Sequence, residues 1–221
     1  MFRTSNTRGK QRFNFFQSFA GTKNDKLKLT KNQIKLIEDS NAIILAEKIE
    51  LLLVSLGNKL TTELYMKVQQ GYKWSDKEQK EIPNQKDLKA ITQLLDQLPF
   101  KYFEDTLPKN NRQNGKLQKF VWYQVSVNEA VSHFMKEYAD DLTEFEEGVL
   151  YGFPLSAIRA FSGLIKPNHD KPTAASVNLA GVCSADFWED EQEYYGLWWE
   201  RFRMLSPKIV AEAEKDCLEQ T

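Results

Sequence analysis

Residue types that support common kinds of chemistry are scarce in this sequence of 221 residues. Two cysteines, Cys183 and Cys217, are too few for a disulfide-stabilised scaffold or a cysteine zinc site. Two histidines leave little material for histidine-rich metal chemistry. No apolar run approaches the roughly eighteen residues that cross a bilayer, so we predict no membrane span. We therefore expect no metal and no cofactor.

Glycine, proline and net charge exclude further classes of protein. Ten glycines and seven prolines are too few for a collagen-like or low-complexity chain. Thirty basic and thirty-one acidic residues give a formal net charge of −1, which excludes a bulk polyelectrolyte role. With 41% hydrophobic residues the chain can bury a core. The composition is typical of an ordinary globular protein, and we predict a cytoplasmic location.

The charges are unevenly placed along the chain. Residues 1–36 contain nine basic residues and one acid, whereas residues 137–221 contain seven basic and seventeen acidic residues. This asymmetry predicts a flexible basic arm over residues 1–29 and a single, mostly helical domain over residues 30–221. The arm suits an anionic partner. The residues that would contact nucleic acid are Arg3, Arg8, Lys10 and Arg12.

Phenylalanines accompany the basic residues of the arm, at Phe13, Phe15, Phe16 and Phe19. Such rings stack on nucleic-acid bases, insert into acidic lipid surfaces or pack on the chain's own domain. The arginine and serine content also suits an organelle-targeting peptide, which is the alternative to a cytoplasmic location. Packing on the domain is the interpretation we favour.

Helical periodicity dominates the rest of the chain. Thr30 with Gln33 forms a capping box, which predicts the start of a helix. Apolar residues then recur at helical spacing as far as residue 68, with Gly57-Asn58 as a candidate break. Three more segments follow from the same reasoning: a charged loop over residues 75–81, an amphipathic helix over 84–98 and a helix ending near 140.

Only residues 119–127 indicate a strand, because β-branched and aromatic residues alternate there. A strand needs a partner, and residues 175–182 are the best candidate within the chain. A helix over residues 122–135 remains open as an alternative, since short apolar runs are ambiguous by period. The predicted fold class is mainly α, a multi-helix domain with a small β-sheet around residues 119–127.

A helix, a sharp elbow and a second helix are predicted over residues 143–161. Thr143 and Glu146 form a second capping box, Gly152 suits a left-handed helix end, and Pro154 suits the first turn of the next helix. A ligand or partner site at this elbow is one interpretation. Its candidate binding residues are Gly152, Phe153 and Pro154.

This layout resembles a helix-turn-helix DNA reader, over some twenty residues. The resemblance implies that the second helix enters the major groove. Base readout there uses Arg, Lys, Asn or Gln, whereas the second helix opens with Leu155, Ser156 and Ala157. Glu144, Glu146 and Glu147 in the first helix would also repel phosphates. A packed structural elbow is therefore the interpretation we favour.

Candidate catalytic and metal-binding residues are few. His169 lies in a polar loop and could activate Cys183 as a nucleophile if the fold brought them together. Side-chain hydrogen bonds within a turn explain the loop more simply. Glu129, His133 and Glu137 share one helical face, as metal ligands do, but a half-buried histidine is the simpler interpretation.

The last fifty residues are rich in aromatics. A helix opening near Ser184 is predicted to face the core with Phe187, Tyr194, Trp198 and Phe202. A second row on this helix is expected to keep exposed surface and to bind a partner: Trp188, Tyr195 and Trp199. Ser206-Pro207 predicts the start of a final helix.

Three functions follow, in order of preference. The first is a non-catalytic intracellular protein-binding or adaptor protein, which binds an unknown protein partner. The second is a nucleic-acid-binding protein that uses the basic arm and the elbow at residues 143–161. The third is a hydrolase that uses Cys183 and His169. Catalysis is the least supported, because no residue pattern requires it.

Overall fold

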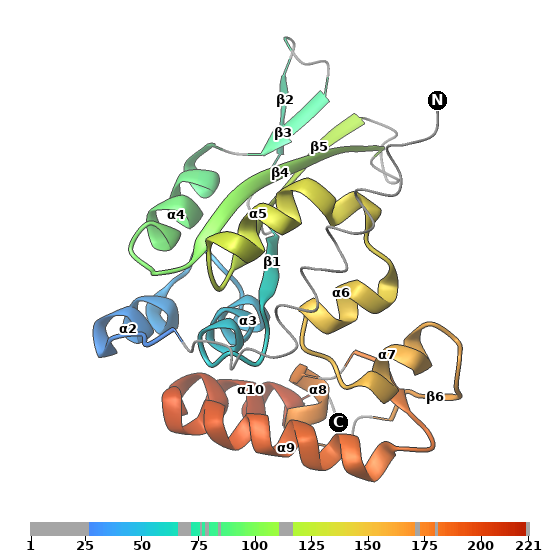
Figure 1. Cartoon of the computed structure of the whole chain (residues 1–221). Helices are drawn as coiled ribbons and strands as arrows, with labels where there is room; N and C mark the ends of the chain where they lie inside the picture. The colour runs from blue at the N-terminus through green and yellow to red at the C-terminus, as the bar shows by residue number, and fades with distance from the viewer. Residues whose placement is uncertain are drawn as a thin grey trace, which may run out of the picture.

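A computed structural model describes residues 27–65, 72–75, 77, 80–83, 85–110, 117–170, 173–179 and 181–219. It confirms a mainly helical fold with a minor β-sheet (Figure 1). The helices are α2 (Lys31–Asp39), α3 (Leu45–Ser55), α4 (Gln85–Leu95), α5 (Glu129–Tyr138), the 3-10 turn η2 (Ala139–Asp141), α6 (Glu144–Leu150), α7 (Leu155–Phe161), α8 (Ala174–Leu179), α9 (Trp188–Leu205) and α10 (Pro207–Glu219).

The strands form two sheets. The strands are β1 (Thr61–Tyr65), β2 (Tyr72–Ser75), β3 (Lys80–Pro83), β4 (Lys101–Asn110), β5 (Leu117–Ser126), β6 (Pro167–Asn168) and β7 (Cys183–Ser184). The larger sheet is built on β5, which pairs with β4 along its whole length, with β1 near its end and with β3 near its start. β6 and β7 form a short antiparallel pair.

The predicted strand at residues 119–127 is confirmed as β5, but its predicted partner is wrong. Residues 174–179 form α8, because Thr173 caps them: its Oγ1 accepts a hydrogen bond from the Ser176 backbone N–H at 3.1 Å. The true partners are β1 and β4. Both pair with β5 antiparallel, and the register places Thr61 opposite Ser126.

The helical spacing from residue 30 to residue 68 corresponds to two helices and a strand, so one long helix with a flaw at Gly57-Asn58 is wrong, whereas the predicted start and the break are right. Thr30 and Gln33 form the capping box of α2. α2 ends at Asp39, and Ser40 is its C-cap residue. α3 ends before Gly57, whose φ of 74° is left-handed. The next apolar residues belong to β1. Residues 75–81, predicted as a loop, include parts of β2 and β3, and Val68 lies outside the described residues.

The core joins the sheet to the helices on both sides of it. α5 contacts β4 and β5, while α3 contacts β1 (Figure 1). Helices α8, α9 and α10 pack together at the bottom of this view, and α10 also contacts α3. The helix pair α6–α7 lies beside this layer at the right, where α7 contacts β7.

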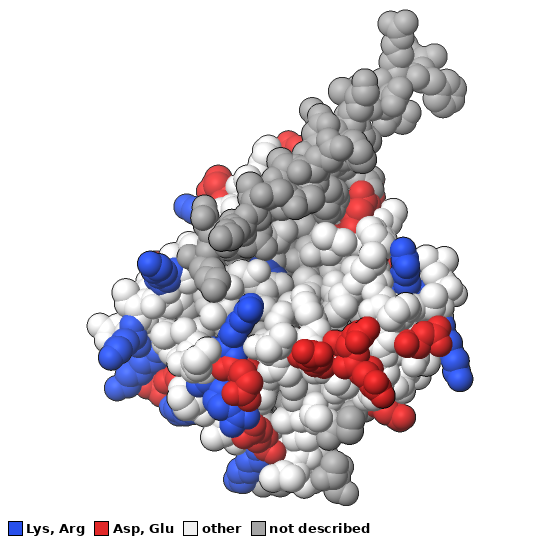
Figure 2. Space-filling model, turned by 60° about the horizontal axis from the view of Figure 1, so that its bottom comes forward, with Lys and Arg blue, Asp and Glu red and all other residues white. Residues whose placement is uncertain are grey.

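The bottom face of the molecule is mixed in charge. Figure 2 shows the largest group of acidic side chains right of centre and most of the basic side chains to the left, where some acidic side chains lie among them. This agrees with α9, which has three acidic residues in its first turn and Arg203 in its last; both placements favour the helix dipole. In the part of the chain that the structure describes, no helix has the length and apolar character needed to span a bilayer.

Candidate functional site: a pocket at the elbow between two helices

The elbow forms as the sequence predicts. The Thr143 Oγ1 accepts a hydrogen bond from the Glu146 backbone N–H at 3.3 Å, and the Glu146 carboxylate accepts one from the Thr143 N–H at 2.9 Å. α6 ends at a turn in which Gly152 has a φ of 74°, so the predicted left-handed residue is confirmed. α7 begins directly after Pro154.

Contacts from distant segments hold this turn in place. A Cβ on Gly152 would lie 1.9 Å from the carbonyl oxygen of Asn58, so the two backbones meet too closely for any side chain. The Leu60 N–H donates to the Leu150 carbonyl oxygen at 2.9 Å. From α9, the Tyr194 hydroxyl donates to the Gly152 carbonyl oxygen at 3.2 Å. The elbow is therefore anchored to the segment between α3 and β1 and to α9.

The two helices of the elbow also pack closely against each other. A Cβ on the buried Gly148 would lie 2.7 Å from Cγ1 of Ile158. Only a glycine lets Ile158 approach α6 this closely. The remaining faces of the two helices diverge around a cavity.

This cavity, the elbow pocket, has a volume of about 290 Å³. Tyr151, Phe153, Ala157, Ile158, Phe161 and Val182 give it a mainly apolar lining, which Gly148 and Gly181 complete. Its charged lining residues are Glu144 and Glu147. The volume is at the small end of the range of ligand sites, about 300–1,000 Å³. It suits one large apolar side chain rather than a cofactor.

A second cavity of about 360 Å³, the tyrosine hollow, shares Tyr151 with the elbow pocket. Its other lining residues come from α3, β1 and the segments before them: Ile44, Ala46, Glu47, Glu50, Lys59, Thr62, Glu63 and Tyr65. The linings of both cavities therefore combine carboxylate groups with apolar side chains. Ile44 and Tyr65 are each more than two-fifths exposed.

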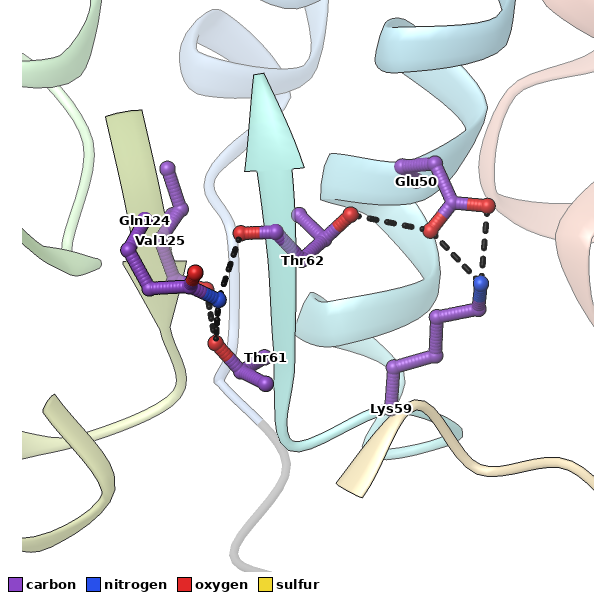
Figure 3. A network of polar contacts seen from close by, with 6 residues as sticks. All are labelled: Glu50, Lys59, Thr61, Thr62, Gln124 and Val125. Atoms are coloured by element: carbon purple, nitrogen blue, oxygen red, sulfur yellow. Dashed lines mark hydrogen bonds and ion pairs between the residues drawn. The ribbon is translucent and has the colours of Figure 1, made fainter. Parts of the chain in front are cut away.

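A polar network fixes one wall of the tyrosine hollow (Figure 3). The Lys59 Nζ lies 2.8 and 2.6 Å from the two Glu50 carboxylate oxygens, and Thr62 Oγ1 donates to Glu50 at 3.0 Å. On the other side of β1, the Gln124 side chain donates to Thr61 Oγ1 at 2.7 Å. Because Lys59 is 3% exposed, this ion pair is well shielded from water.

The same lysine links the two cavities. Its Nζ lies 5.1 Å from the centroid of the Phe153 ring, a cation–π geometry. Phe153 in turn lines the elbow pocket. The buried Glu50–Lys59 pair therefore helps to hold a pocket-lining ring in position.

Burial and neighbouring negative charges raise the pKa values of three acidic groups at the site. Burial raises the pKa of Glu147, and the neighbouring carboxylates of Glu63 and Glu144 raise it further. Burial likewise raises the pKa of Tyr151, which hydrogen-bonds with Gln124 and Glu63. The pKa of Tyr65 is raised by burial and by its hydrogen bond to Glu63. A cation placed here would relieve the repulsion between carboxylates.

The structure places the predicted elbow residues in different roles. Phe153 lines the elbow pocket, whereas Gly152 and Pro154 shape the turn that carries it. The basic residues proposed for nucleic acid, Arg3, Arg8, Lys10 and Arg12, lie outside the described residues.

The predicted partner surface on the aromatic helix is wrong in its exposure. Tyr195 is 0% exposed and Trp199 4% exposed, because both face the core, and Trp188 is half-buried. Of the row predicted to face the core, Trp198 and Phe202 are buried. The other two are Tyr194, which is half-buried, and Phe187, which precedes the helix and is 47% exposed. Most of the aromatic surface of α9 is therefore buried against the rest of the chain.

The segments that carry His169 and Cys183 do meet. Asn168 on β6 pairs with Cys183 on β7, and His169 follows Asn168 directly. The Cys183 thiol, however, lies in the core at 0% exposure, and His169 is exposed. A substrate could not reach the thiol in this conformation. The Asn168 side chain accepts a hydrogen bond from the Asp170 N–H at 3.0 Å, as expected for a turn.

His133 and Glu137 form an exposed i, i+4 pair, with Nε2 and Oε1 3.5 Å apart, while Glu129 lies 3.5 Å from Lys101. Across the described ranges, no group of three or more His, Cys, Asp or Glu side chains could hold a metal ion. The arrangement on α5 is that of surface ion pairs.

Sequence reasoning missed most residues of the site. Glu144, Glu147 and Tyr151 are spaced by three and four residues, so the helical period alone places them on one face. Glu63 and Tyr65 could not be found in this way, because only the pairing of β1 with β5 brings them to the elbow. Comparison with protein-family models, with curated proteins and with solved structures finds no match to this chain.

Proposed function

We propose that this chain is a non-catalytic protein-binding protein of the cytoplasm, and that the elbow pocket takes an apolar side chain of a partner segment that also carries basic residues. The observation that carries the proposal is the pocket itself. It is an apolar cavity of about 290 Å³ whose charged lining residues, Glu144 and Glu147, are both acidic. Peptide grooves of this kind bury an anchor side chain and use charge at the rim for specificity.

The exposed surface at the pocket supports this reading. Phe161 lines the pocket and is 62% exposed, and the Tyr151 and Phe153 rings that also line it are half-buried. Exposed apolar residues that gather beside a cavity usually mark an interaction site.

The two alternative functions receive less support. For nucleic acid, the carboxylates of Glu144 and Glu147 at the elbow oppose phosphate groups. For a Cys/His hydrolase, the thiol of Cys183 is buried. A binding role needs neither a basic elbow nor a reachable nucleophile.

The test measures binding of a fluorescein-labelled peptide, SGKRFSFSG, by fluorescence anisotropy. Two control peptides replace either both basic residues by glutamine or both phenylalanines by serine. We expect saturable binding of the first peptide and a loss of at least about tenfold in affinity for each control. Equal binding of all three peptides, or binding of none, would contradict the proposal.

A matched pair of variants ties the binding to the pocket. A Cβ on Gly181 would contact the Phe153 ring at 3.8 Å, an ordinary packing distance, so Gly181→Leu should fill the pocket without strain. A Cβ on Gly196 has no neighbour within 4 Å, which makes Gly196→Leu the control. We expect only Gly181→Leu to abolish peptide binding.

A further inference from the structure

We infer that the elbow pocket binds residues 10–19 of this same chain, so that the basic arm occupies its own partner site until a partner displaces it. This inference rests on the proposed function, since it names the occupant of the same pocket. The occupant is identified by its chemistry, a cation followed by aromatic side chains.

The pocket supplies unpaired negative charge. Within the part of the chain that the structure describes, Glu144 and Glu147 are exposed and have no ion-pair partner. Lys59, which lines the neighbouring tyrosine hollow, is already engaged by both carboxylate oxygens of Glu50. The repulsion that raises the pKa of Glu147 comes from two other carboxylates. An incoming Arg or Lys would lower that repulsion.

The pocket also supplies aromatic surface that is left uncovered. Phe161 stands at its edge with 62% of its surface exposed, and the Phe153 and Tyr151 rings form its walls. Aromatic rings pair edge-to-face or offset, with centroids about 4.5–7 Å apart. A phenylalanine entering the pocket would meet rings on several sides.

Residues 10–19 carry both matching features. Their sequence is KQRFNFFQSF, in which Lys10 and Arg12 directly precede Phe13 and a cluster of further phenylalanines. No acidic residue occurs before Asp25. No carboxylate within the segment would therefore oppose those of the pocket.

The tether makes this binding feasible even if the contact is weak. Leu27 packs against the core, so the arm is fixed at that point. The eleven residue-to-residue steps from Phe16 to Leu27 span roughly 36 Å when extended, about twice the ~17 Å radius of gyration expected for a chain of this length. A tether of this kind gives an effective concentration in the millimolar range. A separate partner must compete with it.

The first experiment locates the arm in the full-length protein by photo-crosslinking. Phe16→p-benzoylphenylalanine is introduced, the protein is irradiated, and the products are separated by gel and mapped by mass spectrometry. We expect a monomeric product linked within residues 144–161 or 181–182. The link should disappear with Gly181→Leu and persist with Gly196→Leu. A dimeric product would overturn binding in cis in favour of a second copy, and links elsewhere, or none, would overturn the inference.

The second experiment measures competition with the SGKRFSFSG probe. The full-length variant Phe13→Ser/Phe15→Ser/Phe16→Ser/Phe19→Ser should bind the probe at least about fivefold more tightly than the unaltered chain, because its own arm no longer competes. Phe2→Ser, outside the segment, is the matched control and should change nothing. Equal affinities in all three proteins would overturn this inference alone. Failure of the probe to bind any of them would overturn the proposed function itself.

Discussion

The hydroxyl of Tyr194 donates a hydrogen bond to the carbonyl oxygen of Gly152 at 3.2 Å, which joins the middle of α9 to the elbow forty-two residues earlier in the chain. The ring of Trp198, one turn further along α9, lies 4.7 Å from that of Tyr194 and would meet a Cβ on Gly152. The elbow pocket therefore depends on a helix that does not line it. Mutations in α9 should act on binding through stability.

We expect Gly152→Ala to destabilise the fold more than Gly163→Ala. Left-handed strain for a residue with a side chain costs about 1–3 kcal/mol, and the Cβ would also collide with Asn58. Gly163→Ala is the control, because Gly163 has a φ of 71° but open space around it. Urea unfolding should show about 1 kcal/mol for Gly163→Ala and at least twice that for Gly152→Ala. Equal losses would show that the close approach to Asn58 is unimportant.

Two neighbouring tyrosines should respond differently to loss of the hydroxyl. Tyr194→Phe removes the bond to Gly152 and should cost about 0.5–1.5 kcal/mol of unfolding free energy. Tyr195→Phe should be neutral or stabilising, because the buried Tyr195 hydroxyl has no hydrogen-bond partner among the described residues. The comparison requires only two denaturation curves. A larger loss for Tyr195→Phe would refute this assignment.

Truncation of Trp198 should be among the most costly changes in α9. The side chain is buried and packs on Tyr194 and Tyr195. Trp198→Ala leaves a cavity and should cost about 3–5 kcal/mol. Leu197→Ala, at the exposed neighbouring position, should change stability by less than about 0.5 kcal/mol. A small effect of Trp198→Ala would mean that the helix packs more loosely than the structure indicates.

Breaking the shielded ion pair should lower stability and loosen the pocket together. Lys59→Met leaves the Glu50 carboxylate without its cation and removes the charge over the Phe153 ring. We expect a loss of about 2 kcal/mol, less than the roughly 3–5 kcal/mol of a fully buried pair, because the Glu50 side chain is 23% exposed. The double variant Lys59→Met/Glu50→Gln should recover part of that loss. No recovery would indicate that packing of the lysine stem, rather than charge, is what matters.

Glu147→Gln should change stability and peptide binding in opposite directions. The pKa of Glu147 is raised in the folded protein, so the unfolded chain loses this proton first as the pH rises, and stability falls over that interval. At neutral pH the ionised group therefore opposes folding, and Gln should raise Tm slightly. Below the unfolded-state pKa the two proteins should have equal Tm. At neutral pH the Glu147→Gln variant should bind the basic probe more weakly. A lower Tm of this variant at neutral pH would contradict the prediction that ionised Glu147 opposes folding.

Local signals were enough to predict much of the helical part of the fold. The capping boxes at Thr30 and Thr143 and the left-handed Gly152 each depend on residues within a few positions of one another. β1 was not predicted, because its apolar residues fit a helical period equally well and its pairing with Ser126 spans sixty-five positions. A contact at that separation leaves no trace in local periodicity.

The site was predicted only in part for the same reason. Phe153 was identified because it lies in the elbow, and the face formed by Glu144, Glu147 and Tyr151 could have been found from its spacing. The exposed aromatic surface, however, was assigned to Tyr195 and Trp199, which are buried. A wide arc of aromatic residues on a helix indicates that a large surface is covered. It does not indicate whether the chain's own core or a separate partner covers that surface.

The position of β5 has a consequence for how the chain is made. β1 ends at Tyr65, whereas the residues that pair with it end at Ser126. At a synthesis rate of about 5–20 residues per second, β1 waits roughly 3–12 s after its own synthesis before β5 has been made. During that interval its backbone donors and acceptors have no strand of the sheet to join, and the same is true of β4 until β5 has been made. Protection by a ribosome-associated chaperone would matter most in this window, and a pause in translation placed before residue 117 would lengthen the exposure of β1.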